Sequence, residues 1–326
     1  MNPEIVDALR HAGLCGVAEE PRGEALSGGV SSDIWRIDLA RGPVCVKRAL
    51  PRLRVSQLWE APVERNRYER LWLETASRLV PQAAPKVLAH DDRAGFFVME
   101  YLDPARHPVW KALLREGRAD PAFAAEVGRR LAAIHAGTSG RDVAQAFATD
   151  DIFHAIRLEP YLLATAKAHP DLAVRLAELA ERTATTRECL VHGDASPKNI
   201  LAGPQGPVFL DAECAWYGDP AFDLAFCLNH LLLKCFWVPA ARRGFLDCFD
   251  ALAGAYLERM PAKGVEARSA SLLPALLLAR IDGKSPVEYL TEPAQKDAVR
   301  SIARALVRQF PTELQAVRKT WQESLT

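Results

Sequence analysis

The chain has 326 residues, of which 49% are hydrophobic and 25% are charged, and its 41 lysines and arginines balance its 41 aspartates and glutamates. A net charge of zero gives no electrostatic reason to expect nucleic acid or an anionic membrane as a partner. The longest apolar stretch, residues 221–241, is interrupted by Asp223, Asn229, His230 and Lys234, so it is predicted as a buried helix and not as a membrane span.

In chain order, the pattern first predicts a short helix over residues 3–14 and then a small sheet. Alternation at Ile34, Arg36 and Asp38 favours half-buried strands. Strands are expected around residues 24–29, 32–39, 43–50, 85–92 and 95–102, with one helix inserted at 62–79. Beyond residue 103 helices dominate, at 108–117, 120–137, 151–168, 170–184 and through 221–326, and a strand–turn–strand unit within 189–211 interrupts them. The expected boundary between the two parts lies at residues 101–105.

Seven cysteines lie mostly among apolar residues and form no CxxC pair, as is typical of reduced thiols in a cytoplasmic protein. The first residues, MNPEIVDALRHAGL, carry acids in an amphipathic pattern, which is not typical of a signal peptide. We therefore expect a cytoplasmic protein. Two apolar helices, at 221–237 and 272–281, could be core or interface and leave a homodimer possible.

The stretch LVHGDASPKNILAGPQGPVFLDAEC holds Asp194, Asn199, Asp211 and Glu213 in a short span. Pro197 disfavours helix in the first turn, and a Gly/Pro turn between two apolar runs predicts a hairpin that brings Asn199 near Asp211. Carboxylate and amide oxygens suit Mg²⁺, and a carboxylate outside the metal shell can accept a proton from a hydroxyl. The five-residue spacing from Asp194 to Asn199 is that of a kinase catalytic loop. A simple turn would explain HGD alone, but not the whole pattern.

Lys47 lies inside the apolar run VCVKRAL, where a buried lysine needs an acidic partner or an anion. One strand upstream, the turn LSGGVSSDIW is rich in small residues that let backbone N–H groups approach a phosphate. The residues of this turn considered for phosphate binding are Ser27, Gly28, Gly29, Ser31 and Ser32. No GK[ST] follows, so the turn is not a Walker A loop. A strand-edge lysine and an ordinary hairpin are the plain structural alternatives.

Together these segments resemble the aminoglycoside phosphotransferase and choline kinase-like group of small-molecule kinases. The resemblance rests on SGGVSSDIW, VKRAL, VMEYL, VHGDASPKN and LDAECAWYGDPAFDLAF, and covers roughly residues 22–240. Within the group the chain is most similar to 5-methylthioribose kinases, through the D-x-E element, the following YGDP turn and the helix segment ERNRYERLWL. The resemblance implies an α+β, bilobal protein-kinase-like fold. Residues 1–101 would form an antiparallel-sheet, nucleotide-binding lobe with one helix, and residues 102–326 a mainly helical lobe for catalysis and substrate binding.

The resemblance also implies roles for single residues. Asp194 would be the catalytic base and contact the substrate hydroxyl, Asn199 and Asp211 would bind Mg²⁺, and Glu213 would be a second or water-mediated metal ligand. Lys47 would bind the α- and β-phosphates of ATP with Glu69 as its partner, Glu64 and Glu74 being the competing choices. The adenine would meet the hinge residues Met99, Glu100 and Leu102. Asp223 would accept backbone N–H bonds from the catalytic loop.

Substrate residues are expected in the later part of the chain. Arg280 and Lys284 end an apolar helix, although basic residues there also suit the helix dipole. Trp216 and Tyr217 follow the metal motif and are candidate walls of the substrate site, although such aromatic residues are more often core. Residues 224–326 contain 14 Lys/Arg and 10 Asp/Glu, which favours a neutral or anionic substrate over a polycationic aminoglycoside.

The sequence thus predicts an ATP- and Mg²⁺-dependent kinase that phosphorylates a hydroxyl group of a small metabolite. An antibiotic phosphotransferase, a pseudokinase that binds nucleotide as a scaffold, and a metal-dependent hydrolase built on His192, Asp194 and Asp211 are the alternatives. A hydrolase would leave Lys47 and the hinge-like VMEYL unexplained.

Overall fold

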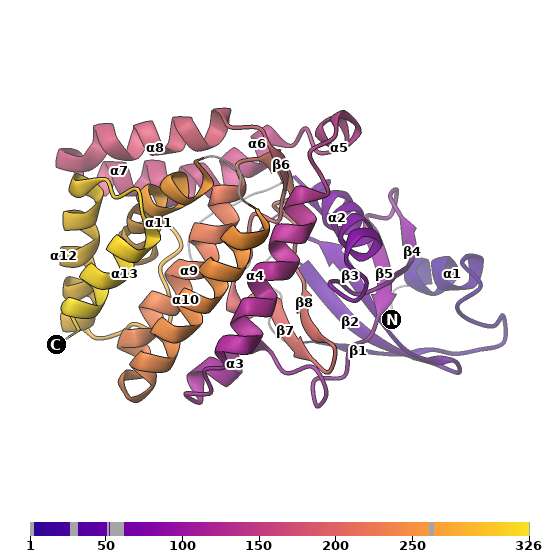
Figure 1. Ribbon diagram of the computed structural model, residues 1–326. Coiled ribbons are helices and arrows are strands. Elements are labelled where there is room, and N and C mark those ends of the chain that lie inside the picture. The colour runs from indigo at the N-terminus through magenta and orange to yellow at the C-terminus, as the bar shows by residue number, and fades with distance from the viewer. Residues whose placement is uncertain (1–2, 27–31, 51, 53–61, 261–263, 326) are drawn as a thin grey trace.

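The computed structural model describes residues 3–26, 32–50, 52, 62–260 and 264–325, with a sheet at one end of the molecule and helices at the other (Figure 1). The first part, here called the sheet lobe, holds a five-stranded antiparallel sheet of order β1-β2-β3-β5-β4. Its elements are α1 (Pro3–His11), β1 (Arg22–Ala25), β2 (Ser32–Leu39), β3 (Gly42–Ala49), α2 (Arg65–Leu79), β4 (Val87–Asp91) and β5 (Phe96–Glu100). The small sheet with one inserted helix, predicted from the sequence, is confirmed.

The two faces of β3 pack against different helices, because neighbouring residues of a strand point to opposite sides. Val46 joins Leu9 of α1 in one apolar cluster. Cys45 belongs instead to the cluster that contains Trp72 of α2. Lys47 stands two residues after Cys45, and its side chain therefore points towards α2.

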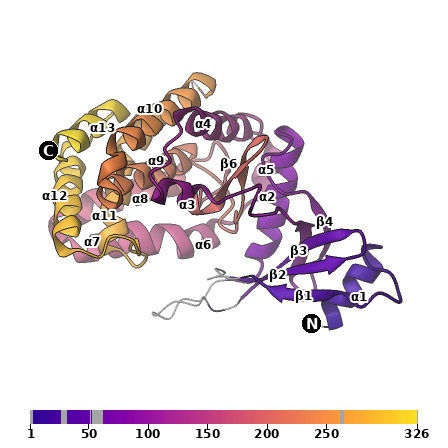
Figure 2. The ribbon, with the colours of Figure 1, turned by 90° about the horizontal axis from the view of Figure 1, so that it is seen from below.

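The rest of the chain, here called the helical lobe, is mainly helical, and the chain termini lie in different lobes (Figure 2). Its elements are α3 (Trp110–Arg115), α4 (Pro121–Ala136), α5 (Arg141–Ala146), α6 (Asp150–Phe153), η1 (His154–Leu163), α7 (Ala164–Ala168), η2 (Pro170–Leu172), α8 (Ala173–Thr185), β6 (Cys189–Val191), η3 (Pro197–Asn199), β7 (Ile200–Gly203), β8 (Gly206–Phe209), β9 (Trp216–Gly218), α9 (Pro220–Trp237), η4 (Pro239–Ala241), α10 (Arg242–Arg259), α11 (Val265–Asp282), α12 (Pro293–Gln309) and α13 (Leu314–Glu323). The division predicted at residue 101 falls between β5 and α3, and the roles assigned to the two parts stay predictions.

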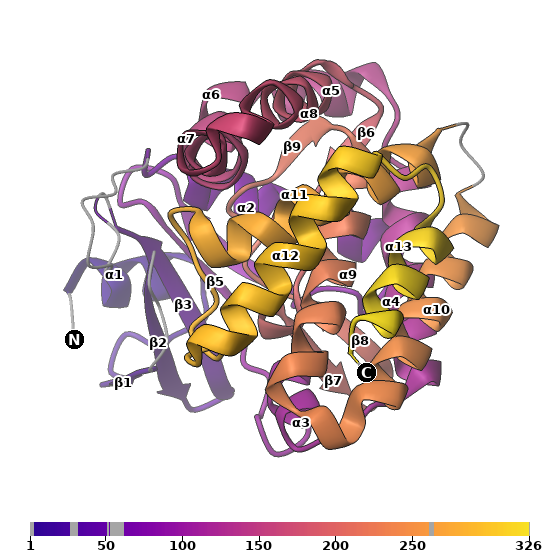
Figure 3. The same cartoon turned by 90° about the vertical axis from the view of Figure 1, so that its left-hand side faces the viewer.

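The apolar stretch after residue 220 forms α9, the central helix of this lobe. Asp219 caps it by accepting a hydrogen bond from the Ala221 N–H at 3.0 Å, and Pro220 occupies its first turn. Every residue from Pro220 to Phe236 is buried, because α10 and α11 pack on α9. In turn α12 packs on α11 (Figure 3). The predicted buried helix is therefore confirmed.

Several local features differ from the sequence prediction. The first strand, predicted at 24–29, is β1 at Arg22–Ala25, and Leu26 lies outside it. Residues 151–168, predicted as one α-helix, contain the π-helix η1, and Pro160 inside it lacks the N–H that a regular helix would use. The short elements α5 and β9 were not predicted. The pairing of β9 with β6, with Trp216 opposite Val191, joins segments that are distant in sequence and leaves no local pattern.

No helix in the described part of the chain has the length and hydropathy needed to cross a bilayer. All seven cysteines are free and buried. Burial raises the pKa of the Cys45 and Cys235 thiols to about 12. The prediction of unpaired cysteines in the core is confirmed.

Candidate active site

The loop after β6 presents Asp194, and a buried carboxylate fixes its backbone. Asp223 of α9 accepts hydrogen bonds from the N–H groups of His192 at 2.6 Å and Gly193 at 2.8 Å. His135 of α4 also lies 3.1 Å from the Asp223 carboxylate. These contacts confirm the prediction that Asp223 binds the backbone of this loop, and they join the loop to two helices of the lobe.

His192 is a neutral structural residue of the same loop. Its Nδ1 atom accepts the Asp194 N–H at 3.1 Å, so its Nε2–H is the donor to the carbonyl oxygen of Leu210 at 3.0 Å. The ring meets Trp72 of α2 edge-on, with centroids 4.7 Å apart. Burial lowers the pKa of His192, which agrees with this tautomer.

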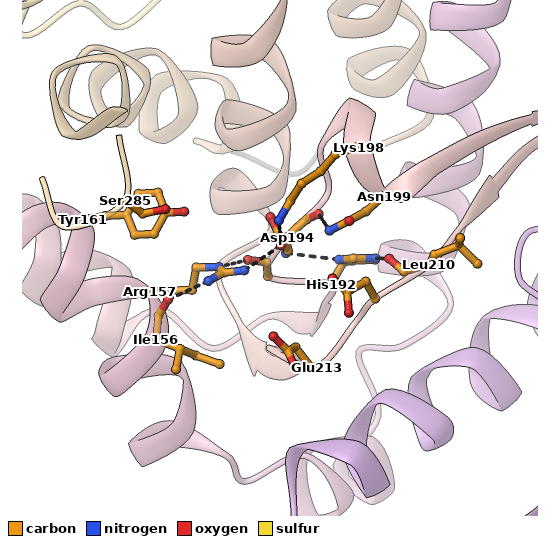
Figure 4. A network of polar contacts seen from close by, with 12 residues as sticks. Ile156, Arg157, Tyr161, His192, Asp194, Lys198, Asn199, Leu210, Glu213 and Ser285 are labelled. Atoms are coloured by element: carbon orange, nitrogen blue, oxygen red, sulfur yellow. Dashed lines mark hydrogen bonds and ion pairs between the residues drawn. The ribbon is translucent and has the colours of Figure 1, made fainter. Parts of the chain in front are cut away.

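The carboxylate of Asp194 lies between two cations (Figure 4). Arg157 of η1 approaches it at 2.9 Å and Lys198 of η3 at 3.1 Å. Burial alone would raise the pKa of Asp194, but Lys198 and Arg157 outweigh burial and lower that pKa. Asp194 is therefore an ionised hydrogen-bond acceptor.

The hairpin of β7 and β8 brings Asn199 and Asp211 together, as the sequence predicted. Ile200 pairs with Phe209, and the Leu210 N–H donates to the carbonyl oxygen of Asn199 at 2.8 Å. The Asn199 Nδ2 atom donates to the Asp194 carbonyl oxygen at 3.1 Å, so Oδ1 is the end of this amide that could bind a cation. Asp211 has a left-handed backbone with φ of 65°, an uncommon conformation that often marks functional positions.

Lys47 is the cation that meets Asp211. Its Nζ atom also lies 2.7 Å from the Glu69 carboxylate, and both Lys47 and Glu69 are buried. This contact confirms that Glu69, and neither Glu64 nor Glu74, is the helix partner of Lys47. Glu64 is exposed, and Glu74 pairs with Arg70 instead. Burial opposes the charge on Lys47, but Asp211 and Glu69 outweigh burial and raise its pKa. Burial raises the pKa of Glu69 to about 7, against the influence of Lys47.

Glu213 lies beside this group and is bound by a residue that the sequence analysis did not select. Arg65, at the start of α2, donates through Nε to the Glu213 carboxylate at 2.9 Å. Arg65 also donates to the backbone oxygens of Pro62 and Leu50. One carboxylate oxygen of Glu213 is thus held by the sheet lobe, and its predicted role as a metal ligand stays a prediction.

The other nucleotide residues predicted from the sequence are only partly described. Ser27, Gly28, Gly29 and Ser31 lie outside the described residues. Ser32 begins β2, and its buried hydroxyl has no hydrogen-bond partner within the described ranges.

The predicted hinge follows the sheet into the helical lobe. Met99 and Glu100 end β5, and Leu102 is the second residue after the strand. The backbone of Glu100 bonds to Lys86, whose N–H also donates to the Glu100 carboxylate at 2.9 Å. The contact between this segment and adenine stays a prediction.

Besides Asp194, four residues were predicted to bind substrate, and they fall into different environments. Trp216 is 1% exposed, stacks on Phe153 and donates to the Asp150 carboxylate at 2.7 Å. The Tyr217 hydroxyl donates to backbone oxygens. These contacts give Trp216 and Tyr217 a packing role and lend no support to a substrate contact.

The two basic candidates are also separated. Arg280 is buried and donates to the Tyr161 hydroxyl at 3.1 Å. Lys284 is exposed and pairs with Glu159 at 2.7 Å. Arg280 is therefore on the inner side of the lobe, whereas Lys284 lies on its surface.

Arg157, like Lys198, lies beside Asp194 and was not selected from the sequence. It comes from a distant helix, and an arginine in an amphipathic segment carries no local signal. Arg65 stood within the segment ERNRYERLWL, but that pattern directed attention to its glutamates.

A metal ion would find an amide oxygen and carboxylate oxygens here. No group of three or more His, Cys, Asp or Glu side chains arranged to hold a metal occurs within the described residues. The donor set formed by Asn199 and Asp211 is of the hard-oxygen kind that Mg²⁺ takes alongside water and phosphate oxygens. The side chains present therefore fit a nucleotide-bound Mg²⁺ rather than an all-protein metal cage.

An antiparallel sheet with a Lys–Glu pair, followed by a helical lobe with Asp and Asn on one loop, defines a phosphotransferase of the protein-kinase-like fold. The sequence profile of the phosphotransferase enzyme family matches residues 22–262, and the chain belongs to this family. A methylthioribose kinase of Pectobacterium atrosepticum is 28% identical over 284 residues, which cover 76% of this chain and 69% of that relative.

Solved structures agree with the fold. A choline/ethanolamine kinase family protein from Mesorhizobium loti is 16% identical, with a TM-score of 0.58 over 96% of this chain and 97% of that one. An amicoumacin kinase solved with AMP-PNP and Ca²⁺ is 13% identical, with a TM-score of 0.56 over 96% and 95% of the two chains. The predicted family and the predicted α+β bilobal fold are confirmed.

Proposed function

We propose that this phosphotransferase transfers the γ-phosphoryl group of ATP, with Mg²⁺, to a hydroxyl group of a small metabolite. The observation that carries the proposal is the meeting of Asp194, Asn199 and Asp211 with the buried pair of Lys47 and Glu69. Phosphoryl transfer needs these parts in one place: a group that orients the hydroxyl, oxygens for the metal, and a cation on the phosphates. The amicoumacin kinase of the same fold, solved with an ATP analogue and a divalent cation, supports the choice of cofactors.

Asp194 would orient the acceptor hydroxyl and accept its proton. Its lowered pKa makes it a weak base, so its main contribution is to place the hydroxyl oxygen in line with the γ-phosphorus. The nearby cations Arg157 and Lys198 would offset negative charge as the phosphoryl group approaches.

Asn199 and Asp211 would hold Mg²⁺, which supplies charge neutralisation on the phosphate oxygens when bound. Lys47 now contacts Asp211 as well as Glu69. With nucleotide present, Glu69 would keep the ammonium of Lys47 in position for the α- and β-phosphates. Asp211 would then turn from Lys47 to the metal.

The first experiment measures ADP release with ATP and Mg²⁺ over a panel of hydroxylated acceptors. The panel begins with methylthioribose, because relatives at 28–30% identity carry that name, and continues with sugars, amino alcohols, hydroxy acids and aminoglycosides. We expect Asp194→Asn to lower kcat about 10²- to 10⁴-fold for the accepted substrate. The exposed Asp297→Asn is the matched control, with unchanged kcat.

Lys47→Ala separates the kinase from a hydrolase. A kinase loses phosphate binding and at least about 100-fold in kcat/KM, since a charge-assisted contact to the phosphates is removed. A hydrolase built on His192, Asp194 and Asp211 would be almost indifferent to this change. Absence of both ATP binding and ADP release in the wild type would refute the proposed function, and ATP binding without turnover of any acceptor would favour a scaffold.

A further inference from the structure

The helical lobe holds a group of basic side chains, of which two, Arg157 and Lys198, contact Asp194, while the other three have no role in the proposed nucleotide site. We call it the basic cluster: Lys111 of α3, Arg157 of η1, Lys198 of η3, Lys234 of α9 and Arg280 of α11. Two aromatic rings contact four of its members in pairs. The Tyr161 ring lies 5.6 Å from the Arg157 guanidinium and 5.7 Å from that of Arg280. The Tyr289 ring lies 4.9 Å from the Lys234 ammonium and 5.6 Å from that of Lys111.

One face of α9 connects the cluster to the catalytic loop. Phe226, His230 and Lys234 follow one another at four-residue spacing, so they share a face of the helix. Arg157, which contacts Asp194, lies 5.7 Å from the Phe226 ring, and Phe226 and His230 have centroids 5.6 Å apart. The row therefore leads from the predicted site of phosphoryl transfer to Lys234.

The cations of the cluster are not all neutralised. Asp194 binds Arg157 and Lys198, and Glu288 binds Lys111. Within the described ranges, no carboxylate lies at ion-pair distance from either Lys234 or Arg280, which are 1% and 8% exposed.

The guanidinium group of Arg280 uses only one of its sides for hydrogen bonds to described residues. Its Nη1 atom donates to neutral oxygens, the Tyr161 hydroxyl at 3.1 Å and the Ser285 hydroxyl at 2.9 Å. Its Nε atom is buried and has no hydrogen-bond partner in the described part of the chain. The Nε2 atom of His230 is likewise buried and has no hydrogen-bond partner among the described residues. Polar atoms buried in this way are unfavourable unless a ligand completes them.

The pKa shifts of Lys234 and of its neighbour His230 agree with a site that lacks a neutralising anion. Burial, with Lys111 and Arg280 nearby, lowers the pKa of Lys234 to about 7. Burial and the neighbouring cations Arg280 and Lys234 lower the pKa of His230. A bound carboxylate would supply the negative charge that these groups lack.

We propose that the acceptor is a small hydroxy acid, whose hydroxyl meets Asp194 and whose carboxylate binds Arg280 and Lys234. This inference rests on the proposed kinase function and names its substrate class. The free edge of a guanidinium matches a planar carboxylate with two parallel hydrogen bonds. The phosphates of ATP are assigned to the side of Lys47 and Asp211. Tyr161 and Ser285, which hold Arg280, lie on the other side of Asp194 from His192 and Leu210 (Figure 4).

The test compares glycerate, threonate and gluconate with their neutral amides. Binding is measured by titration calorimetry in the presence of AMP-PNP and Mg²⁺, and turnover by ADP release with ATP. At least one acid should bind about 10- to 100-fold more tightly than its amide, the range expected for hydrogen bonds to a charged group.

Two variants examine the assigned contacts. Arg280→Gln and Lys234→Met should each raise Kd and KM for the acid at least tenfold, while KM for ATP stays unchanged. Lys234→Met should also raise Tm, because it removes a buried cation, so weaker binding cannot be ascribed to misfolding. The matched controls are Arg308→Gln and Lys167→Met on the surface, which should behave as the wild type.

The outcomes separate the substrate class from the activity. Preferred binding of the neutral acceptors, equal binding of acids and amides, or indifference of both variants would overturn the hydroxy-acid proposal and leave the kinase untouched. Acid binding that depends on Arg280, without phosphorylation of any acceptor, would support the binding site and count against the kinase.

Discussion

Two buried lysines of this chain show opposite responses to burial. Lys47 lies between the carboxylates of Glu69 and Asp211, which outweigh burial and raise its pKa. Lys234 contacts the rings of Trp237 and Tyr289, and burial lowers its pKa from 10.5 to about 7. The difference comes from the partners, since both side chains are almost fully buried.

Lys234→Met should stabilise the protein, and by more at low pH than at high pH. The folded state binds the Lys234 proton less tightly than the unfolded state, so between about pH 7 and 10.5 wild-type stability rises with pH on account of this group. Below pH 7 the ammonium is charged in both states and its full desolvation penalty is present. We expect the variant to gain roughly 2–4 kcal/mol at pH 6, and a gain that falls towards zero near pH 10.

The measurement is urea unfolding of wild type and variant at pH 6 and pH 9.5. The difference between the two proteins cancels the titration of groups that do not interact with Lys234, and it retains that of Lys234 and its coupling to the neighbours Lys111 and Glu288. An equal gain at both pH values would show that Lys234 does not titrate as described.

At the scale of elements, the loop that carries Asp194, residues 192–199, is held by close backbone packing. Gly193 has φ of 76°, and a Cβ atom added to it would come within 2.5 Å of the Cys214 carbonyl oxygen. The carboxylate of Asp223 accepts hydrogen bonds from the same backbone, from the N–H groups of His192 and Gly193. The loop and the segment from Asp211 to Cys214 therefore cannot shift relative to each other without a steric clash.

Gly193→Ala should displace these two segments from each other. We expect a loss of stability of about 2–4 kcal/mol, from the strained φ together with the steric clash, and a loss of most phosphotransferase activity. Chemical denaturation and ADP release measure the two effects. Gly254→Ala is the control, because Gly254 lies within α10 with nothing within 4 Å of an added Cβ; a gain of about 0.5–1 kcal/mol is expected there. Unchanged activity in Gly193→Ala would contradict the predicted close coupling.

The parts of the site that the sequence predicted are those formed by local structure. Asn199 and Asp211 flank one hairpin, and the turn residues between β7 and β8 already indicated that they would meet. The pairing of Lys47 with Glu69 joins two elements of the sheet lobe, and Glu69 was selected through the resemblance of the segment ERNRYERLWL to the kinase helix. Arg157 and Arg65 were missed because their contacts join elements far apart in sequence. The same reason hid β9, and it left Trp216 and Tyr217 as substrate candidates although their side chains pack elsewhere.

At the scale of the whole molecule, two acidic residues of one segment tie the sheet lobe to the helical lobe. Asp211 contacts Lys47 of β3, and Glu213 contacts Arg65 of α2. Both contacts cross between the lobes at the place where nucleotide is proposed to bind. The relative position of the lobes thus depends on the same carboxylates that the metal site would use.

Arg65→Met should loosen this connection. Removing one partner of a buried ion pair leaves Glu213 unpaired and is expected to destabilise by about 3–5 kcal/mol. We expect the variant to unfold in two transitions, with the sheet lobe melting first, and limited proteolysis to cleave near α2, whereas the wild type is expected to unfold in one. Calorimetry with and without AMP-PNP and Mg²⁺ measures this. Arg67→Met, an exposed change on the same helix, should unfold as the wild type, and a single unshifted transition in Arg65→Met would refute the prediction.

The seven buried cysteines allow such opening to be followed without any engineered label. Cys15 and Cys45 belong to the sheet lobe, Cys189 and Cys214 flank the catalytic loop, and the other three lie in α9 and α10. Because each thiol is covered and those of Cys45 and Cys235 have a pKa of about 12, an alkylating reagent reacts only after the surrounding segment has moved. The order in which the cysteines are alkylated in the native enzyme would therefore record which parts of the molecule open first, and whether nucleotide slows the opening around the active site.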